Sequence, residues 1–225
     1  MIHEGWRPFR SLGRLGGTRM RDQTISDFLD RLAARVPAPG GGASAALHGA
    51  QAAALLGMVA RYSDGRKHAE HERVIGRVLA EADALRDEAL QLAEDDAAAF
   101  TSVTDAYRLP KATEEERATR SAAIAEALVA AAGPPARTID VARRLVGLAE
   151  ELLPVGNRNV ITDVAAATEA ARAAATTARV NVEINLAGIG DERIRAELAG
   201  RAAGVDEIAD RAERVTAAVR EEIAK

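Results

Sequence analysis

Residues 37–60 read PAPGGGASAALHGAQAAALLGMVA, and this stretch decides the fold class. Behind two prolines and three glycines, the chain is almost wholly small and apolar, with Ser44, His48 and Gln51 as the exceptions. A helix that is apolar on every side belongs in the centre of a protein, surrounded by other helices. Because its alanines and glycines let neighbouring helices approach closely, we expect a buried, Ala-rich central helix here.

The composition of the whole chain also favours helices. About 52 of the 225 residues are alanine, and only 3% are aromatic. Alanine, leucine, arginine and glutamate favour helices, whereas the aromatic and β-branched residues that favour strands are scarce. No segment alternates between apolar and polar residues as a strand would. The apolar stretch is long enough to span a membrane, but it is mostly Ala and Gly and no second span exists, so we expect no membrane association.

Several classes of function are excluded by charge and residue content. The net charge is −4 and no basic stripe is present, so nucleic acid is not an expected partner. The absence of cysteine excludes disulfides, thiol catalysis and cysteine-ligated metals. His68 and His71 are three residues apart but lack the spacing of a metalloprotease helix, so we expect them to face solvent.

The first nineteen residues differ from the rest of the chain. They hold four arginines against one acidic residue, and glycines and arginines interrupt every apolar run, so no signal-peptide core is present. We interpret residues 1–19 as a disordered extension or a misassigned start and assign them no function. Residues 20–225 are expected to form one domain, in the cytoplasm.

Caps, glycines and prolines divide residues 20–225 into six or seven helices. Thr24 with Asp27, and Thr113 with Glu116, have the spacing of helix-starting caps. Pro37 and the Gly-Pro-Pro at 133–135 are expected to end helices. The predicted helices cover about residues 25–36, 43–60, 68–107, 114–132, 139–152, 163–186 and 191–225, the last with possible breaks at Gly200 and Gly204. The expected fold class is an all-α, single-domain bundle.

A carboxylate interrupts the apolar seam of the longest predicted helix. Apolar residues recur at steps of three and four from Ile75 to Ala106, and Asp96 occupies one of these seam positions. Asp95 falls off the seam and should be solvated. A buried carboxylate must be neutral, paired or hydrogen-bonded, and burial raises its pKa towards the range useful for proton transfer. A structural ion pair or cap is an equally good explanation of Asp96.

Two further polar segments are candidates for binding. The triple glycine leaves backbone N–H groups uncovered at the start of a helix, which suits an anion, although a flexible loop explains it too. Asn181 and Asn185 lie four apart on one helix face, where asparagine is unfavourable unless it makes hydrogen bonds. Asp163 lies roughly 27 Å from Asn181 along the same helix. The two therefore serve opposite ends of a long ligand, or meet across a symmetric dimer.

Five segments resemble one known family. They are residues 37–59, LAEDDAAAF at 92–100, YRLPKATEEERATR at 107–120, VGNRNVITD at 155–163 and RVNVEINL at 179–186. Together they resemble the cyclodeaminase/cyclohydrolase family, which includes the C-terminal half of formiminotransferase-cyclodeaminase and stand-alone methenyltetrahydrofolate cyclohydrolases. The chain departs from the family pattern at Ala43, where serine is common, and at His48, where a small apolar residue is expected.

The resemblance implies an all-helical homodimer that acts on a folate and uses no metal and no redox cofactor. The reaction expected first is that of a formimidoyltetrahydrofolate cyclodeaminase, which closes a ring to methenyltetrahydrofolate and releases ammonia. The alternatives are a methenyltetrahydrofolate cyclohydrolase and, from another class, a catalytically inactive helical scaffold.

The resemblance also suggests roles for individual residues. Asp96 is the first candidate for proton transfer and Asp163 the second. Lys111 and Arg120 are candidates for the anionic glutamate tail of the folate, although Arg120 could equally pair with Glu116. The remaining candidates for substrate binding are Gly40, Gly41, Gly42, Ser44, Asn157, Asn159, Asn181 and Asn185.

Overall fold

The computed structural model describes residues 19–225, and every regular element in that range is a helix. The prediction of an all-α bundle of six or seven helices is confirmed. The expectation for the N-terminal extension lies outside the described residues except at Arg19, which pairs with Asp22. The α-helices are α1 (Ile25–Ala33), α2 (Gly41–Tyr62), α3 (Glu72–Arg108), α4 (Glu114–Leu152), α5 (Ile161–Leu186), α6 (Glu192–Ala203) and α7 (Val205–Ile223), and the 3-10 helices are η1 (Met20–Asp22), η2 (Arg66–His71) and η3 (Arg158–Val160).

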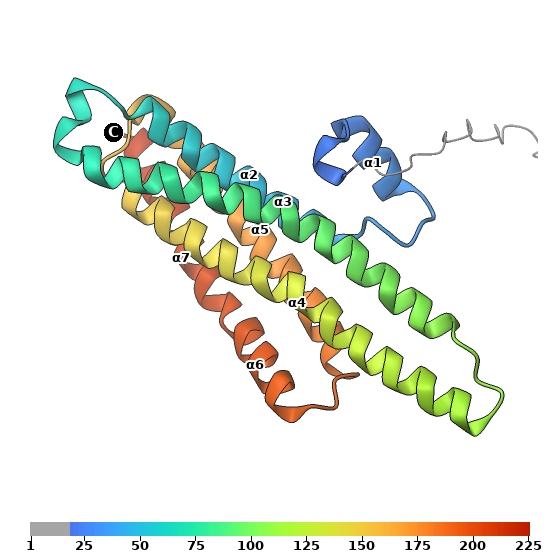
Figure 1. Cartoon of the computed structure of the whole chain (residues 1–225). Coiled ribbons are helices and arrows are strands. Elements are labelled where there is room, and N and C mark those ends of the chain that lie inside the picture. Colours follow the sequence, from blue (N-terminus) through green and yellow to red (C-terminus); the bar gives the residue numbers. More distant parts are fainter. Residues whose placement is uncertain (1–18) are drawn as a thin grey trace, which may run out of the picture.

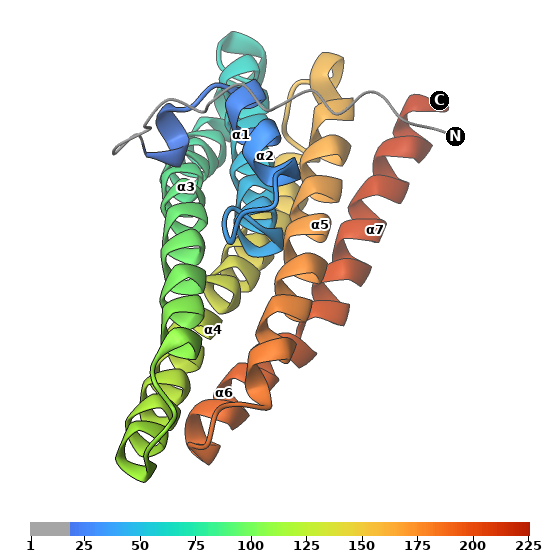
Figure 2. The ribbon, with the colours of Figure 1, turned by 90° about the vertical axis from the view of Figure 1, so that its right-hand side faces the viewer.

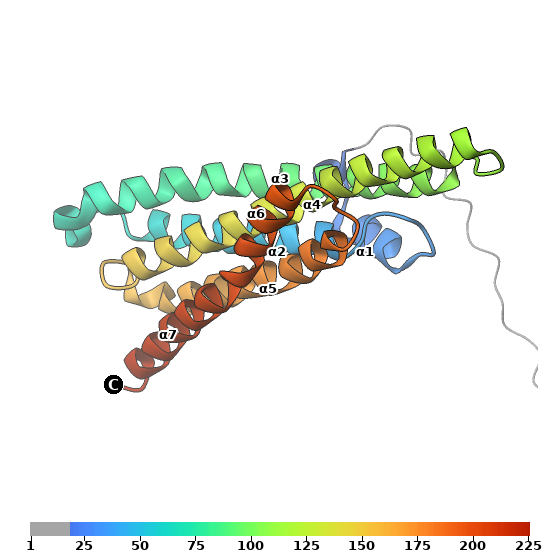
Figure 3. The same cartoon turned by 90° about the horizontal axis from the view of Figure 1, so that it is seen from below.

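The helices α2, α3, α4 and α5 pack together as the body of the molecule (Figure 1). α2 packs against α3, α4 and α5, and α7 lies along α5 on the outside (Figure 2). α3 and α4 extend together beyond the N-terminal end of α2, where a short turn joins them (Figure 3). α1 stands beside the bundle, and none of its residues is buried.

The central position of α2 confirms the interpretation of the Ala-rich stretch. Most of its alanines, together with Leu56 and Val59, are buried. Among the described helices, α2 alone is long and apolar enough to cross a membrane. Of its most apolar window, 61% is buried within the bundle, as expected for a core helix.

The apolar seam predicted for the longest helix is present in α3. Its six seam residues before Asp96 are buried, and they pack against α2 and α4. Thr113 begins α4 with a complete capping box, in which Thr113 accepts from the Glu116 N–H and Glu116 accepts from the Thr113 N–H.

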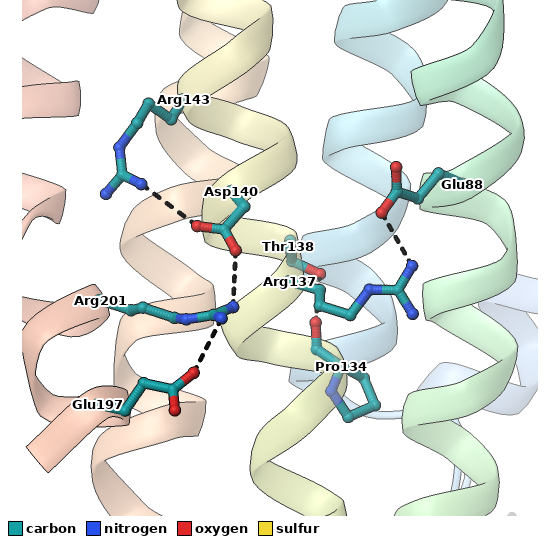
Figure 4. Close-up of polar contacts among 8 residues, drawn as sticks. All are labelled: Glu88, Pro134, Arg137, Thr138, Asp140, Arg143, Glu197 and Arg201. Atoms are coloured by element: carbon teal, nitrogen blue, oxygen red, sulfur yellow. Dashed lines mark hydrogen bonds and ion pairs between the residues drawn. The ribbon is translucent and has the colours of Figure 1, made fainter. Parts of the chain in front are cut away.

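The expectation that Gly133-Pro134-Pro135 ends a helix is wrong. α4 runs through both prolines as one helix. Each proline removes one backbone hydrogen bond, but α4 is held on both sides, so its packing outweighs the loss. Figure 4 shows two of these attachments, Arg137 to Glu88 of α3 and Asp140 to Arg201 of α6.

Three smaller expectations are also corrected. α1 ends at Ala33 and does not continue to residue 36, where the sequence predicted its end. The C-terminal region breaks at Gly204, whereas Gly200 lies inside α6. His68 is partly buried, with its ring Nδ1 3.1 Å from the Val155 carbonyl oxygen, because η2 folds back against the loop that follows α4.

Candidate active site

A cleft of about 550 Å³ opens where the N-terminus of α2 meets α3, α4 and the C-terminal half of α5. Asp96 is the only carboxylate among the described residues that line it, and none of them is a lysine, arginine or histidine. The remaining lining is glycine, amide and apolar, with the phenol of Tyr107 as a further polar group. The lining residues are Pro37, Gly40, Gly41, Gly42, Asp96, Phe100, Val103, Tyr107, Leu128, Ala131, Asn181, Ile184 and Asn185.

The glycine turn and Asp96 are in direct contact. A Cβ atom on Gly42 would lie 2.7 Å from Oδ2 of Asp96 and closer still to Oδ1. Only glycine therefore leaves room for the carboxylate at this position. The N–H of Ala43, the next residue, interacts with the same carboxylate. The N-terminus of α2, proposed from the sequence as an anion site, thus holds the side chain of the protein's own Asp96.

Burial raises the pKa of Asp96 from 3.8 to about 6, and the interaction with the Ala43 N–H opposes part of this rise. No arginine or lysine of the described chain pairs with Asp96, so a structural ion pair does not explain its place in the seam. A carboxylate with this pKa is mostly ionised at neutral pH and is still easily protonated, which suits it to accept and return a proton.

Two asparagines of α5 complete the polar part of the cleft. Nδ2 of Asn181 donates to the Thr177 carbonyl (2.9 Å), and Nδ2 of Asn185 donates to the Asn181 carbonyl (2.7 Å). Each bond uses one of the two N–H groups of the amide, and both Oδ1 atoms remain as acceptors. A Cβ on Gly41 would lie 3.6 Å from Nδ2 of Asn181, so this amide lies beside the glycine turn.

The outer part of the cleft is aromatic, and the positively charged Arg120 lies next to it. Phe100 and Tyr107 of α3 are 48% and 52% exposed. The Arg120 guanidinium lies over the Tyr107 ring, 5.5 Å from its centroid, and donates to the Tyr107 carbonyl (3.1 Å). Glu116 is occupied by the capping box, so Arg120 does not pair with it. Lys111 is exposed in the turn between α3 and α4.

Ser44 and His48 lie away from this cleft. Both line a separate groove of about 480 Å³ between α2 and the apolar side of α1. Ser44 is two residues beyond Gly42, which corresponds to about 200° around a helix. It therefore points to another side of α2 and does not join the glycine turn around Asp96.

The polar segment before α5 lies at the other end of that helix. Asn157 fixes the segment before α5 to the end of α2, a contact that we call the structural crossing. Its Nδ2 donates to the Tyr62 carbonyl (2.8 Å), and its N–H donates to Ser63 Oγ (2.8 Å). Its Oδ1 accepts from the Asn159 N–H. Because α5 is continuous, Asp163 is separated from Asn181 by most of the helix. Within one chain, neither Asp163 nor these asparagines reach Asp96.

Sequence analysis gave no site role to seven residues that line the cleft, which are Pro37, Phe100, Val103, Tyr107, Leu128, Ala131 and Ile184. Phe100, Tyr107 and Leu128 carry no signal of their own, because they become neighbours only when α3 and α4 pair. Ala131 was hidden by the expectation that the helix ends at the double proline. The continuity of α4 is what brings it to the cleft.

Comparison with known proteins identifies the family. The sequence profile of the family Formiminotransferase-cyclodeaminase matches residues 24–204. The methenyltetrahydrofolate cyclohydrolase of Methylorubrum extorquens is 42% identical over 177 residues, which cover 78% of this chain and 85% of that protein. The formimidoyltransferase-cyclodeaminase of Mus musculus is 33% identical over 172 residues, and the match spans 32% of that longer protein.

The fold has a solved relative as well. The crystal structure of formiminotetrahydrofolate cyclodeaminase from Thermotoga maritima superimposes with a TM-score of 0.77 at 29% identity, covering 88% of this chain and 98% of that one. The resemblance inferred from the sequence is thereby confirmed. The chain belongs to the formiminotransferase-cyclodeaminase family of folate cyclodeaminases and cyclohydrolases.

Proposed function

We propose that the protein is a methenyltetrahydrofolate cyclohydrolase in which Asp96 transfers the protons. The observation that carries the proposal is the half-buried Asp96 carboxylate, with its pKa raised to about 6, as the one charged group among the described residues lining the cleft. The methenyl carbon of the substrate is the centre of a cationic amidinium. A cleft that offers one carboxylate and neutral acceptors complements such a cation.

The ring-opening reaction needs one proton to be removed and one to be supplied. Ionised Asp96 accepts a proton from water while the water oxygen attacks the methenyl carbon, which leaves a neutral tetrahedral intermediate. Protonated Asp96 then gives this proton to N5 of the pterin as the carbon–N5 bond breaks. The hydroxyl of the intermediate releases its proton to solvent, and 10-formyltetrahydrofolate and one proton are the products. These steps call for no metal ion and no redox cofactor.

The cyclodeaminase reaction is the second candidate. N10 of a 5-formimidoyl folate attacks the carbon of the formimidoyl group in its protonated, amidinium form, Asp96 moves the N10 proton to the resulting amino group, and ammonia leaves as the cationic methenyl bridge forms. The solved relative from Thermotoga maritima favours this reaction by its name. The higher identity to the Methylorubrum extorquens cyclohydrolase, of which the match covers 85%, favours ring opening. On that ground we place the cyclohydrolase first, although the sequence alone favoured the cyclodeaminase.

The rest of the folate follows the outer cleft in this proposal. With the methenyl carbon at Asp96, the aminobenzoyl ring lies against Phe100 and Tyr107. The anionic glutamate tail then points towards Arg120 and Lys111, whose charges it needs. The part of the cleft formed by residues 19–225 provides no cation for that tail.

A homodimer is part of the proposal. Val180 and Ile184 of α5 are 60% and 76% exposed beside the cleft, and a second copy packed there would bury them. Analytical ultracentrifugation should give twice the chain mass, and Ile184→Glu should shift it towards the monomer. A monomer for the unaltered protein at every concentration would contradict the dimer.

The reaction is tested with two substrates. Purified protein is mixed separately with 5,10-methenyltetrahydrofolate and with 5-formimidoyltetrahydrofolate, and the methenyl absorbance is followed against a protein-free control. The proposal expects a catalysed loss of absorbance in the first mixture. A catalysed gain in the second mixture, without a loss in the first, would establish the cyclodeaminase instead. If neither mixture shows a catalysed change and no folate binds, the inactive scaffold is the alternative that remains.

A further inference from the structure

The double proline inside α4 removes the N–H groups that two backbone carbonyl oxygens would bind in a regular α-helix. In an α-helix, each carbonyl accepts from the N–H four residues further on. Pro134 and Pro135 have no N–H, so the carbonyls of Ala130 and Ala131 cannot make this bond. The hydroxyl of Thr138 donates to the Pro134 carbonyl (3.0 Å) and not to either of these two (Figure 4). Unpaired carbonyls in a folded protein need another donor.

The two alanines that carry these oxygens lie on different surfaces. Ala131, with Leu128, lines the cleft that contains Asp96. Ala130 lines a separate and shallower hollow together with Ser102 and Asp105 of α3. One of the two carbonyls therefore belongs to a residue of the candidate active site, whereas the other belongs to a residue at the open surface, where water can hydrate it.

The cleft offers several hydrogen-bond acceptors. They are the Asp96 carboxylate and the Oδ1 atoms of Asn181 and Asn185, whose Nδ2 groups each donate one of their two N–H groups within α5. The Ala43 N–H at the start of α2 is directed to Asp96. A ligand that matches this pattern presents several N–H groups on one rigid body. A reduced pterin does so, through its 2-amino group and the N–H groups at N3 and N8.

We propose that Pro135 frees the Ala131 carbonyl to accept a hydrogen bond from an N–H of the pterin ring. Pro135 is then a specificity-determining residue that acts through the backbone of the preceding turn. The inference rests on the proposed folate reaction and adds to it the acceptor that recognises the ring. A ligand without the N–H would leave this carbonyl unsatisfied, which penalises its binding.

The matched variants Pro135→Ala and Pro134→Ala test the proposal. Each restores one N–H to α4 and removes one ring from the same stretch of helix, so both should raise the midpoint of thermal unfolding. Only the N–H restored by Pro135→Ala stands four residues after Ala131 and can bind its carbonyl. We expect it to raise the KM for 5,10-methenyltetrahydrofolate by about five- to tenfold, the effect of one lost neutral hydrogen bond, with kcat unchanged. Pro134→Ala should leave both constants as in the unaltered protein.

Every other pattern overturns the proposal. An unchanged KM in Pro135→Ala would show that the carbonyl does not bind substrate. An equal rise in both variants would assign the effect to the bend of α4. A change confined to kcat would place the effect in the chemical step. If the unaltered protein neither binds nor converts the folate, the proposed function fails as well; if it does both, only the role of Pro135 is at stake.

Discussion

The two ends of α5 carry similar polar residues and use them differently. At the C-terminal end, Asn181 and Asn185 keep their Oδ1 acceptors free beside Asp96. Before the N-terminal end, the side chain of Asn157 donates to the Tyr62 carbonyl and accepts from the Asn159 N–H. A cluster of asparagines is therefore evidence for a site only where hydrogen-bonding capacity remains after the backbone has been satisfied. The first end is the candidate active site, and the second is a structural crossing.

The largest expected difference between the two ends concerns their carboxylates. Asp96→Asn should lower kcat by about 100-fold or more, because the amide cannot accept and return the proton. Folding should be retained. The raised pKa means that the folded state binds the proton more tightly than the unfolded chain, so the ionised carboxylate costs stability above about pH 6. The asparagine removes that cost, and urea unfolding at pH 7.5 should show an equal or higher stability.

Asp163→Asn is the control at the other end of α5. Because Asp163 lies far from Asp96 within one chain, kcat should change by less than about threefold, the size of a minor electrostatic effect. A loss as large as that of Asp96→Asn would instead show that a second subunit brings its α5 to the cleft.

The next largest effect is expected at the glycine turn. Gly42→Ala places a Cβ atom where the Asp96 carboxylate lies and must displace it. A displacement of this kind should lower kcat by about 10- to 100-fold. Gly40→Ala is the matched control, since a Cβ there meets nothing within 4 Å. Steady-state kinetics of the two variants, with circular dichroism to verify folding, would refute the contact if they behaved alike.

A smaller effect of a different kind is expected at the structural crossing. Asn157→Ala removes the hydrogen bond to the Tyr62 carbonyl and the cap on Asn159, so it should destabilise the fold by about 1–2 kcal/mol. Urea denaturation measures this loss, and kcat at a temperature where the variant stays folded should equal that of the unaltered protein. A kinetic defect without a loss of stability would make this end functional.

Local sequence patterns predicted the parts of the molecule that depend on one helix at a time. The apolar stretch predicted α2, the seam predicted α3, and the break in the seam at Asp96 predicted the carboxylate of the cleft. Thr113 and Glu116 marked the start of α4 because a capping box is a local interaction.

The remaining features depend on how helices pack together. The prolines of α4 have a strong local preference to end a helix, and only the contacts with α3 and α6 overcome it. The cleft wall at Phe100, Tyr107 and Leu128 forms only when α3 and α4, which a short turn joins, pack side by side. Ser44 was misplaced because two residues along a helix turn a side chain to another face.

The pH dependence of kcat/KM tests the role of Asp96 most directly. The hydration of 5,10-methenyltetrahydrofolate is measured from pH 5 to pH 8, with the uncatalysed rate subtracted at each pH. Since the ionised carboxylate is the base, kcat/KM should rise about fivefold from pH 5 to pH 6 and level off above an apparent pKa of about 6. Asp96→Asn should abolish this inflection. A profile without an inflection near pH 6, or the same inflection in Asp96→Asn, would contradict the assignment of proton transfer to Asp96.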